Sequence, residues 1–324
     1  MTLERNIKYL GRSKAIYSLS EPLYPRYASG ITQHVWKSHR LGSDPVVVKF
    51  RRLDTPQSRS DFQNEITQLR KLEDCRYIRG ILDAIEDPAD KAIDHGMILE
   101  WFPETLWEAR ENGRLSSFGL VGIRKIMKNV LEGIQELHSR EFIHLDIKAQ
   151  NILSNGLSAK LSDLGSIWPA SPSSRGTAQP MPYRSPGILF GREWSKEVDI
   201  WGWGMVYVHM VQACIRPDIW GLYDRLHEES TLEATTAYEE RVRQDIFHDF
   251  RLYSIRLYEE CEDRWPGLDP DRKDVTIRSI LEYLQFPENE ICFLQEVLNP
   301  DPTARPTAKA ILDSGWLDNL SEDH

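Results

Sequence analysis

Residues 142–153 read FIHLDIKAQNIL, and this stretch decides how the rest of the chain is interpreted. Most of it is apolar, yet Asp146, Lys148 and Asn151 stand within six positions of one another. A buried strand does not tolerate an acid, a base and an amide without partners. Two interpretations stay open on these residues alone: a polar surface turn, or a loop held between two buried strands whose polar groups converge on a ligand.

The composition limits the class of protein. A chain of 324 residues with 40% hydrophobic residues and 10 Trp is long enough for one large or two small folded units. The formal net charge of −10 argues against general nucleic-acid binding, which needs a basic surface, and is compatible with a basic partner or substrate.

The cysteines and the apolar runs predict the cellular location of the protein. The four cysteines show no metal-binding spacing, which favours reduced thiols in an intracellular protein, cytoplasmic or nuclear. The charged N-terminal stretch lacks an apolar signal region, and the longest apolar run, residues 201–211, is too short to span a bilayer. We therefore expect no membrane partner.

The first part of the chain, to about residue 102, is rich in strand patterns. Residues 30–40 roughly alternate, residues 45–50 form a β-branched run, and residues 95–102 form a further apolar run. One helix interrupts them at residues 60–72, with Ser60 or Asp61 near its start.

Helical patterns dominate from about residue 104. Residues 116–138 carry one apolar stripe, which predicts an amphipathic helix, and helical patterns resume at 195–212. Between them, residues 163–186 are rich in Pro and Ser, and a loop this long in a compact domain is usually functional. The sequence thus predicts a small β-rich lobe, a larger α-rich lobe and a short acidic tail.

Two charged residues of the first lobe form a candidate pair. Lys49 ends the run VVVK, and alternation puts it on the same face as Val47. Glu65 lies on or beside the apolar stripe of the following helix. The alternatives are an edge strand with a solvated lysine and a glutamate in water. Taken together, the two residues suggest an ion pair that holds the lysine toward a phosphate.

A second acid, Asp163, follows a short strand in the sequence Asp-Leu-Gly. An acid followed by glycine at a strand end is commonly a turn. A hard carboxylate oxygen on a backbone able to bend also suits Mg²⁺.

In their order, these features resemble the signature of the protein kinase family: strand Lys, helix Glu, the loop His-Leu-Asp-Ile-Lys-Ala-Gln-Asn, and Asp-Leu-Gly. Three later segments also resemble kinase motifs: MPYRSPGILFG (181–191), EVDIWGWG (197–204) and NPDPTARPTAKAIL (299–312). The resemblance runs from about residue 7 to 317, and its motifs are closest to the SR-protein kinases and their neighbours in the cyclin-dependent and MAP kinase group.

The resemblance implies an α+β, bilobal kinase fold with an N-lobe at 1–102, a C-lobe at 103–318 and a tail at 319–324. It implies ATP and Mg²⁺ as cofactors and a Ser/Thr-type protein or peptide acceptor, with which a basic sequence would be electrostatically compatible. It leaves the oligomeric state open.

The same resemblance assigns the site residues. Asp146 would be the catalytic base and Lys148 would meet the γ-phosphate, while Asn151 and Asp163 would hold magnesium. Lys49, fixed by Glu65, would hold the α- and β-phosphates. Val47 would form the roof and Leu153 the floor of the adenine site. Glu100 and Phe102 of the hinge would offer backbone hydrogen bonds to adenine, with Leu99 at the gate position. The glycine-rich loop would contribute Leu10, Gly11 and Ser13.

The chain departs from the family pattern at three places. Of the glycine-rich loop only Gly11 remains in residues 11–16. An alternative alignment shortens the loop by two residues and matches Ile16-Tyr17 to its closing strand. Either alignment predicts weaker ATP binding. Leu145 replaces the arginine that receives a phosphorylated activation loop, so we expect little dependence on phosphorylation at Ser171, Ser173, Ser174 or Thr177.

The third departure is Gly187, which replaces a glutamate that pairs with the arginine matching Arg305. We expect Glu193 or Glu197 to meet Arg305 instead, because a buried charge without a partner is costly. Two alternatives to an active kinase remain: a pseudokinase acting as a binding scaffold, and a kinase-fold enzyme that acts on a peptide precursor or a small metabolite.

Overall fold

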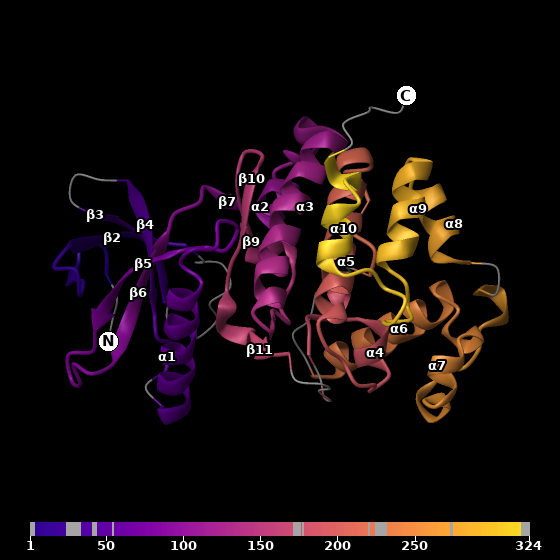
Figure 1. The fold of residues 1–324 in the computed structure, drawn as a ribbon, viewed down its shortest axis with the longest axis horizontal. Coiled ribbons are helices and arrows are strands. Elements are labelled where there is room, and N and C mark those ends of the chain that lie inside the picture. Colours follow the sequence, from indigo (N-terminus) through magenta and orange to yellow (C-terminus); the bar gives the residue numbers. More distant parts are fainter. Residues whose placement is uncertain are drawn as a thin grey trace. The chain divides into compact units, whose positions relative to one another are not determined.

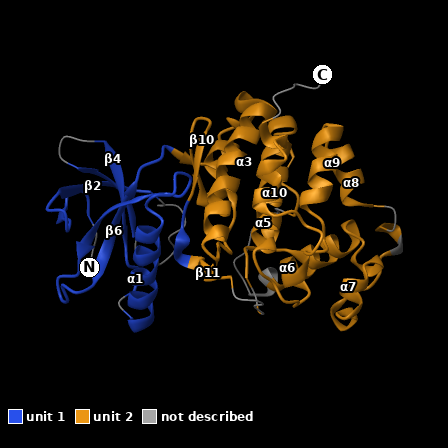
Figure 2. Cartoon of the chain, in the orientation of Figure 1, with its two compact units in different colours: residues 1–103, 162–165 blue, residues 104–161, 166–324 orange. Residues whose placement is uncertain are grey.

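The computed structural model describes residues 4–23, 34–40, 44–53, 55–170, 176, 178–219, 221–223, 232–272 and 275–318. It consists of two compact units, one formed by Met1–Pro103 with Ser162–Gly165 and the other by Glu104–Leu161 with Ser166–His324 (Figure 2). The sequence predicted two consecutive lobes, whereas the structure groups Ser162–Gly165 with the first unit, where Asp163 forms an ion pair with Lys49. Residues 30–33, the four loop hydroxyl residues named above and the tail lie outside the described residues.

Unit 1 is built on a six-stranded antiparallel sheet in the order β1-β2-β3-β4-β6-β5 (Figure 1). Its strands are β1 (Lys8–Leu10), β2 (Ile16–Pro22), β3 (Val35–Arg40), β4 (Pro45–Phe50), β5 (Ile81–Glu86) and β6 (Asp94–Glu100).

Strand β4 carries the predicted alternation. Val46, Val48 and Phe50 belong to one buried core cluster, whereas Val47 and Lys49 alternate with them. The strand pairs with β3 on one side and with β6 on the other. The edge-strand interpretation of Lys49 is therefore wrong, because β4 has a neighbouring strand on each side. A lysine in such a strand needs a partner for its charge.

Helix α1 (Pro56–Lys71) supplies that partner and begins earlier than the sequence analysis predicted. Thr55 is its N-cap, accepting a hydrogen bond from the Ser58 amide at 3.2 Å, and Pro56 is its first residue. A capping threonine followed by proline is a strong start signal, so the predicted start at Ser60 or Asp61 is corrected.

Unit 2 is mostly helical. Its helices are α2 (Leu106–Glu111), α3 (Leu115–Ser139), α4 (Pro186–Leu189), α5 (Glu197–Ile215), α6 (Leu232–Asp249), α7 (Arg256–Glu259), α8 (Ile277–Tyr283), α9 (Glu288–Val297) and α10 (Ala308–Asp313). Its short strands are β7 (Glu104–Thr105), β8 (Phe142–Ile143), β9 (Ile152–Asn155), β10 (Ser158–Leu161) and β11 (Trp168–Pro169). They form one sheet in the order β10-β9-β7 and one β11-β8 pair.

The core of unit 2 centres on α3 and α5, which pack against each other along their length (Figure 1). Nearly every residue of α5 is buried, which explains why its sequence is apolar on all sides. Gly204 allows the end of α9 to approach, because a Cβ there would lie 2.8 Å from side-chain atoms of Val297 and Leu298. In the described parts of the chain, no helix has both the length and the apolar character needed to cross a bilayer.

Candidate active site

The loop that follows β8 is shaped by one buried carboxylate. Asp199 of α5, which is fully buried, accepts hydrogen bonds from the amides of His144 at 2.7 Å and Leu145 at 3.0 Å. The ring of His138 lies 3.0 Å from the same carboxylate. Leu145 has a φ of 64°, a left-handed conformation uncommon for leucine, so Asp199 stabilises a backbone turn that the sequence disfavours.

The three polar side chains of this loop converge on Asp146. The ammonium of Lys148 donates to both carboxylate oxygens, at 2.9 and 2.8 Å. Asn151 donates from Nδ2 to the Asp146 carboxylate at 2.7 Å and to its carbonyl at 2.9 Å. The side chain of Asp146 is 18% exposed, so the group is partly shielded but open to a substrate. The polar-turn interpretation does not account for this convergence.

A second cluster gathers in unit 1 around Lys49. Its ammonium lies 2.6 Å from Oε1 of Glu65 and 3.2 Å from Oδ1 of Asp163. Burial alone would lower the pKa of Lys49, but the two carboxylates together raise it above its ordinary value. Burial also raises the pKa of Glu65, and Asp163 adds to this effect while Lys49 opposes it. Lys49 is therefore held cationic between two acids.

The Asp-Leu-Gly segment brings Asp163 to this cluster through a backbone turn. Asp163 has a φ of 61°, and a short 3-10 helix, Leu164–Ser166, follows it. A Cβ at Gly165 would lie 3.4 Å from Oδ1 of Asp163 and 3.7 Å from Oε2 of Glu65. The turn interpretation and the ligand interpretation of Asp163 are thus compatible, because the turn itself directs the carboxylate toward Lys49.

Asn151 and Asp163, the two predicted magnesium ligands, both carry oxygen donors. Asp163 offers a carboxylate, and because Nδ2 of Asn151 donates to Asp146, its amide oxygen faces away from that carboxylate. Carboxylate and amide oxygens are ligands that Mg²⁺ accepts, so the residue types fit. In the described ranges, no group of three or more His, Cys, Asp or Glu side chains gathers as a metal site.

The glycine-loop assignment is corrected by the register of the sheet. Lys49 pairs with Val35, the first residue of β3, whereas residues 11–15 adjoin the end of β2 that pairs with Arg40, the last residue of β3. Along the ladder this separation is about 17 Å, at 3.3 Å per residue. Leu10 is also 62% exposed. The carbonyl of His34, the residue before β3, accepts a hydrogen bond from the amide of Phe50, next to Lys49, at 2.7 Å. Residues 24–33 lie outside the described residues.

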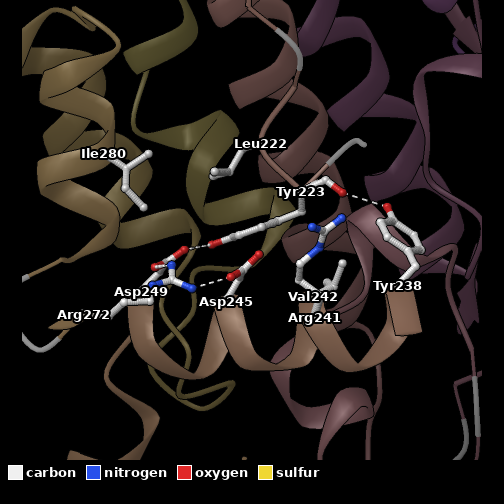
Figure 3. Close-up of a pocket in the computed structure, with 9 residues that line it drawn as sticks. All are labelled: Leu222, Tyr223, Tyr238, Arg241, Val242, Asp245, Asp249, Arg272 and Ile280. Carbon is white, nitrogen blue, oxygen red and sulfur yellow. Dashed lines mark hydrogen bonds and ion pairs between the residues drawn. The ribbon is translucent and has the colours of Figure 1, made fainter. Parts of the chain in front are cut away.

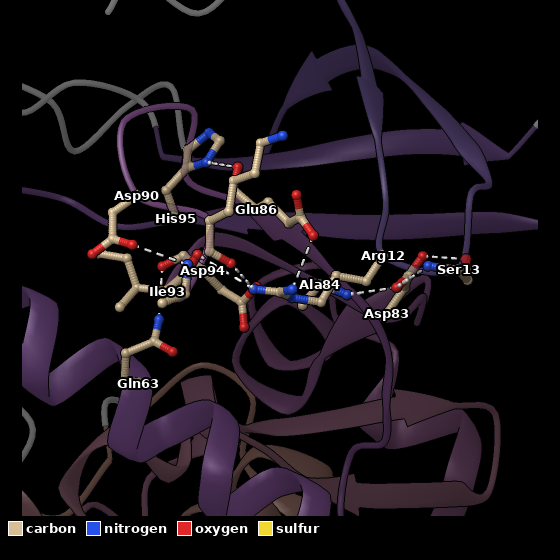
Figure 4. Close-up of polar contacts among 12 residues, drawn as sticks. Arg12, Ser13, Gln63, Asp83, Ala84, Glu86, Asp90, Ile93, Asp94 and His95 are labelled. Carbon is tan, nitrogen blue, oxygen red and sulfur yellow. Dashed lines mark hydrogen bonds and ion pairs between the residues drawn. The ribbon is translucent and has the colours of Figure 1, made fainter.

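The 11–15 turn makes polar contacts with β5 and β6 through Arg12 and Ser13 (Figure 4). Arg12 donates to Asp94 at 2.5 Å and to Glu86 at 2.9 Å, on β6 and β5. Asp83 of β5 accepts from both the amide and the hydroxyl of Ser13. A Cβ at Gly11 would collide with the Asp83 carboxylate, at 2.1 Å from Oδ2. Arg12 and Ser13 therefore fasten the turn after β1 to β5, and Gly11 leaves room for the Asp83 carboxylate.

The predicted adenine and hinge residues are placed as follows. Val47 is buried in β4, where it pairs with Leu99 of β6, and Leu153 is buried in β9 of unit 2. Phe102 is half-buried. Glu100 ends β6, and both of its backbone groups are engaged within unit 1. Its amide donates to the Gly80 carbonyl at 3.2 Å, and its carbonyl accepts two hydrogen bonds from Arg79.

Arg305 is buried and hydrogen-bonded to Glu197, one of its two predicted partners, but through the main chain of Glu197 and not its carboxylate. Its Nη1 donates to the main-chain carbonyl of Glu197 at 2.7 Å, and its other donors reach the Asn299 carbonyl at 3.1 and 2.8 Å. The Glu197 carboxylate instead accepts a bond from the Ser195 amide. Burial lowers the pKa of Arg305 to about 10. Carbonyl oxygens, rather than a bonded carboxylate, therefore replace the glutamate missing at Gly187.

A separate cavity of about 280 Å³ lies in unit 2 (Figure 3). Tyr238, Val242 and Asp249 of α6 line it together with Tyr223 and Arg272, among others. The ring of Tyr223 points toward Asp249, which also faces Arg272. None of the predicted site residues lines this cavity.

Sequence reasoning missed three functional neighbours of the site. His138 and His144 lie on the Asp199 network, and Arg79 covers the carbonyl of Glu100. The one available signal for Arg79 was a charged residue inside the apolar run YIRGIL, residues 77–82.

Comparisons with known proteins agree with this geometry. The protein kinase domain model matches residues 29–317. A probable cyclin-dependent kinase 8 of Dictyostelium discoideum is 31% identical over 282 residues, covering 79% of this chain and 68% of the relative. A probable cyclin-dependent serine/threonine-protein kinase of the same organism is 30% identical over 189 residues, 56% of this chain and 13% of the relative.

A mitogen-activated protein kinase of Zygosaccharomyces rouxii is 27% identical over 212 residues, 60% of this chain and 49% of that kinase. The chain thus covers about two thirds of the cyclin-dependent kinase 8 relative, but about half or less of the other two relatives. The α+β fold expected from the motifs is confirmed by the domain match and by the strand-rich and helix-rich units. The chain belongs to the protein kinase family, in the neighbourhood of its cyclin-dependent, mitogen-activated and dual-specificity members.

Proposed function

We propose that this chain is an ATP-dependent protein kinase that transfers the γ-phosphoryl group to serine or threonine hydroxyls of a protein or peptide. The convergence of Lys148 and Asn151 on the Asp146 carboxylate carries the proposal. A carboxylate fixed by a cation and an amide is suited to orient an acceptor hydroxyl and take its proton. Lys148 then offsets negative charge on the transferring group.

The residues of unit 1 complete the proposed chemistry. Lys49, held by Glu65, binds the α- and β-phosphates, and Val47 with Leu153 of unit 2 contacts the adenine. Asn151 and Asp163 are the proposed magnesium ligands. When bound, Mg²⁺ supplies charge neutralisation for the phosphates.

Turnover of ATP with magnesium by the whole chain tests the proposal. Wild type and Asp146→Asn are compared over basic peptides, generic protein substrates and metabolites, with Asp313→Asn as a matched control. Asp313 is an exposed residue of α10, paired only locally with Lys309. We expect Asp146→Asn to lower kcat by about 10²- to 10⁴-fold and the control to leave it unchanged. Equal background rates for all three proteins would refute the proposal.

A second function is favoured by one observation. Arg79 donates two hydrogen bonds to the carbonyl of Glu100, the group expected to receive adenine. A chain that binds nucleotide poorly would serve as a binding scaffold instead of an enzyme. The same assay separates the two, because a scaffold shows no turnover that depends on Asp146.

We also propose an intracellular location, from the state of the cysteines. All four are free, with Cys75 and Cys261 buried. Free thiols are typical of reducing compartments. Alkylation of cells lysed directly into denaturant without reductant should label four thiols per chain, whereas an intermolecular disulfide would contradict the location.

A further inference from the structure

Arg79 is fixed against the end of β6 by a short network within unit 1. Its Nε lies 2.9 Å and its Nη2 2.7 Å from the carbonyl oxygen of Glu100. The neighbouring Gly80 amide donates to the Glu100 carboxylate at 2.9 Å, and the Glu100 amide returns a bond to the Gly80 carbonyl. These four contacts hold Arg79 in register with Glu100.

The position after Arg79 is a glycine that leaves room for the Glu100 side chain. A Cβ at Gly80 would lie 3.3 Å from Cδ of Glu100, tighter than nine in ten such contacts. The absence of a side chain at Gly80 therefore lets the Glu100 carboxylate reach the Gly80 amide. Arg79 is also half-buried, which limits the alternative conformations of its long side chain.

The guanidinium changes what the Glu100 carbonyl offers to a ligand. A carbonyl oxygen has two lone pairs, and Arg79 directs two donors at this one oxygen. Hydrogen bonds from a charged donor are about twice as strong as neutral ones, so a neutral amine competes poorly for the same oxygen. A base that approaches this oxygen therefore meets the Arg79 guanidinium, where the hinge prediction expected a carbonyl acceptor.

Arg79 also belongs electrostatically to the Lys49 cluster. Burial raises the pKa of Glu65, and the charges of Lys49 and Arg79 oppose that rise. The positive charge of Arg79 thus acts on Glu65, the ion-pair partner of Lys49.

We propose that Arg79 is a base-selectivity residue: by occupying the Glu100 carbonyl, it denies the exocyclic amine of adenine its acceptor. The inference rests on the proposed function, because it takes Glu100 as part of the nucleotide site. It follows that the amine contributes nothing to binding. A purine nucleotide without the amine therefore binds the wild-type chain at least as tightly as ATP.

Calorimetric titration of the whole chain tests this, with ATP and with purine riboside triphosphate, which lacks only the 6-amino group. The variants are Arg79→Met and the matched control Arg76→Met, which removes an exposed arginine from the same segment. We expect an affinity ratio of ATP to the analogue at or below one in wild type and in the control. In Arg79→Met the ratio should rise by about two- to tenfold, the usual value of one hydrogen bond.

Every outcome decides the inference. A wild-type chain that prefers ATP over the analogue severalfold overturns it without any variant, and leaves the proposed function standing. An unchanged ratio in a folded Arg79→Met protein overturns it as well. Absence of nucleotide binding by wild type and by Arg79→Met overturns both the inference and the proposed function.

Discussion

Asp249 of α6 accepts a hydrogen bond from Tyr223 at 2.8 Å and one from Arg272 at 2.7 Å, yet its side chain is almost fully buried. Burial raises the pKa of its carboxyl from 3.8 to about 6, against the opposing effects of Tyr223 and Arg272. The folded chain therefore keeps a proton on Asp249 at pH values where the unfolded chain has released it.

This difference predicts a pH-dependent stability. Between the unfolded pKa near 3.8 and the folded pKa near 6, the folded state binds more protons, so the unfolding free energy falls as the pH rises. Relative to Asp249→Asn, wild type should lose about 2 kcal/mol from pH 4 to pH 7. Urea unfolding of both proteins across that range measures it, and parallel pH profiles would contradict the pKa shift.

Arg305 gives a second prediction at this scale. Since Arg305 bonds the carbonyls of Glu197 and Asn299, its removal leaves buried acceptors unsatisfied. Arg305→Met should lower the unfolding free energy by about 2–4 kcal/mol, whereas Glu197→Gln should change it by less than about 1 kcal/mol. Chemical denaturation compares the two variants. Equal losses would show that the Glu197 carboxylate is the true partner.

At the scale of the elements, the turn between β1 and β2 is held to β5 and β6 by polar contacts. Arg12 joins it to Glu86 and Asp94, and Asp83 receives Ser13. Arg12→Ala and Asp83→Asn should each destabilise the chain by about 1–3 kcal/mol and leave nucleotide affinity within about twofold of wild type. Thermal unfolding and nucleotide titration test this, with Lys49→Met as the variant that loses affinity. A tenfold loss of affinity in Arg12→Ala would restore the phosphate-loop assignment.

The loop carrying Leu145 is held by apolar packing where the resemblance expected an arginine. Leu145 is buried with Ile143, Ile188, Trp194 and Val198 in one cluster. The indole of Trp194 also donates to the Gly176 carbonyl at 3.2 Å, which fastens the segment before α4 without any phosphate.

This packing predicts a rate that does not depend on loop phosphorylation. Changing Ser171, Ser173, Ser174 and Thr177 together to alanine should leave kcat within about twofold of wild type, because a phosphate there meets no cation at position 145. Steady-state assays of the phosphorylated and unphosphorylated chain provide the check. A tenfold drop in the alanine variant would point to another phosphate receptor.

At the scale of the whole molecule, the net charge of −10 acts on the encounter with an acceptor. An acidic surface attracts a basic peptide over a distance set by the Debye length, about 10 Å at 0.1 M salt. We therefore expect KM for an arginine-rich peptide to rise by about tenfold from low salt to about 0.5 M, with kcat nearly constant. A neutral peptide of equal length is the control. The same salt response for both peptides would remove the case for a basic acceptor.

Much of the fold was predictable from local patterns. The β-branched run of β4, the apolar stripe of α3 and the apolar helix α5 all form where periodicity indicated. Element boundaries were less secure, as the early start of α1 at Pro56 shows. A helix start depends on one capping interaction, whereas a helix interior depends on many residues acting together.

The sequence by itself determined the kinase family and the polar groups of the 142–153 loop, because their order and spacing are properties of the chain. Only the tertiary structure decided which groups meet. The 11–15 turn belongs with β5, Arg305 with two carbonyls, and Arg79 with Glu100. These partners lie far along the chain or on another strand, where register and burial rather than spacing set the distance. A hydrogen bond depends on that distance to within a few tenths of an ångström.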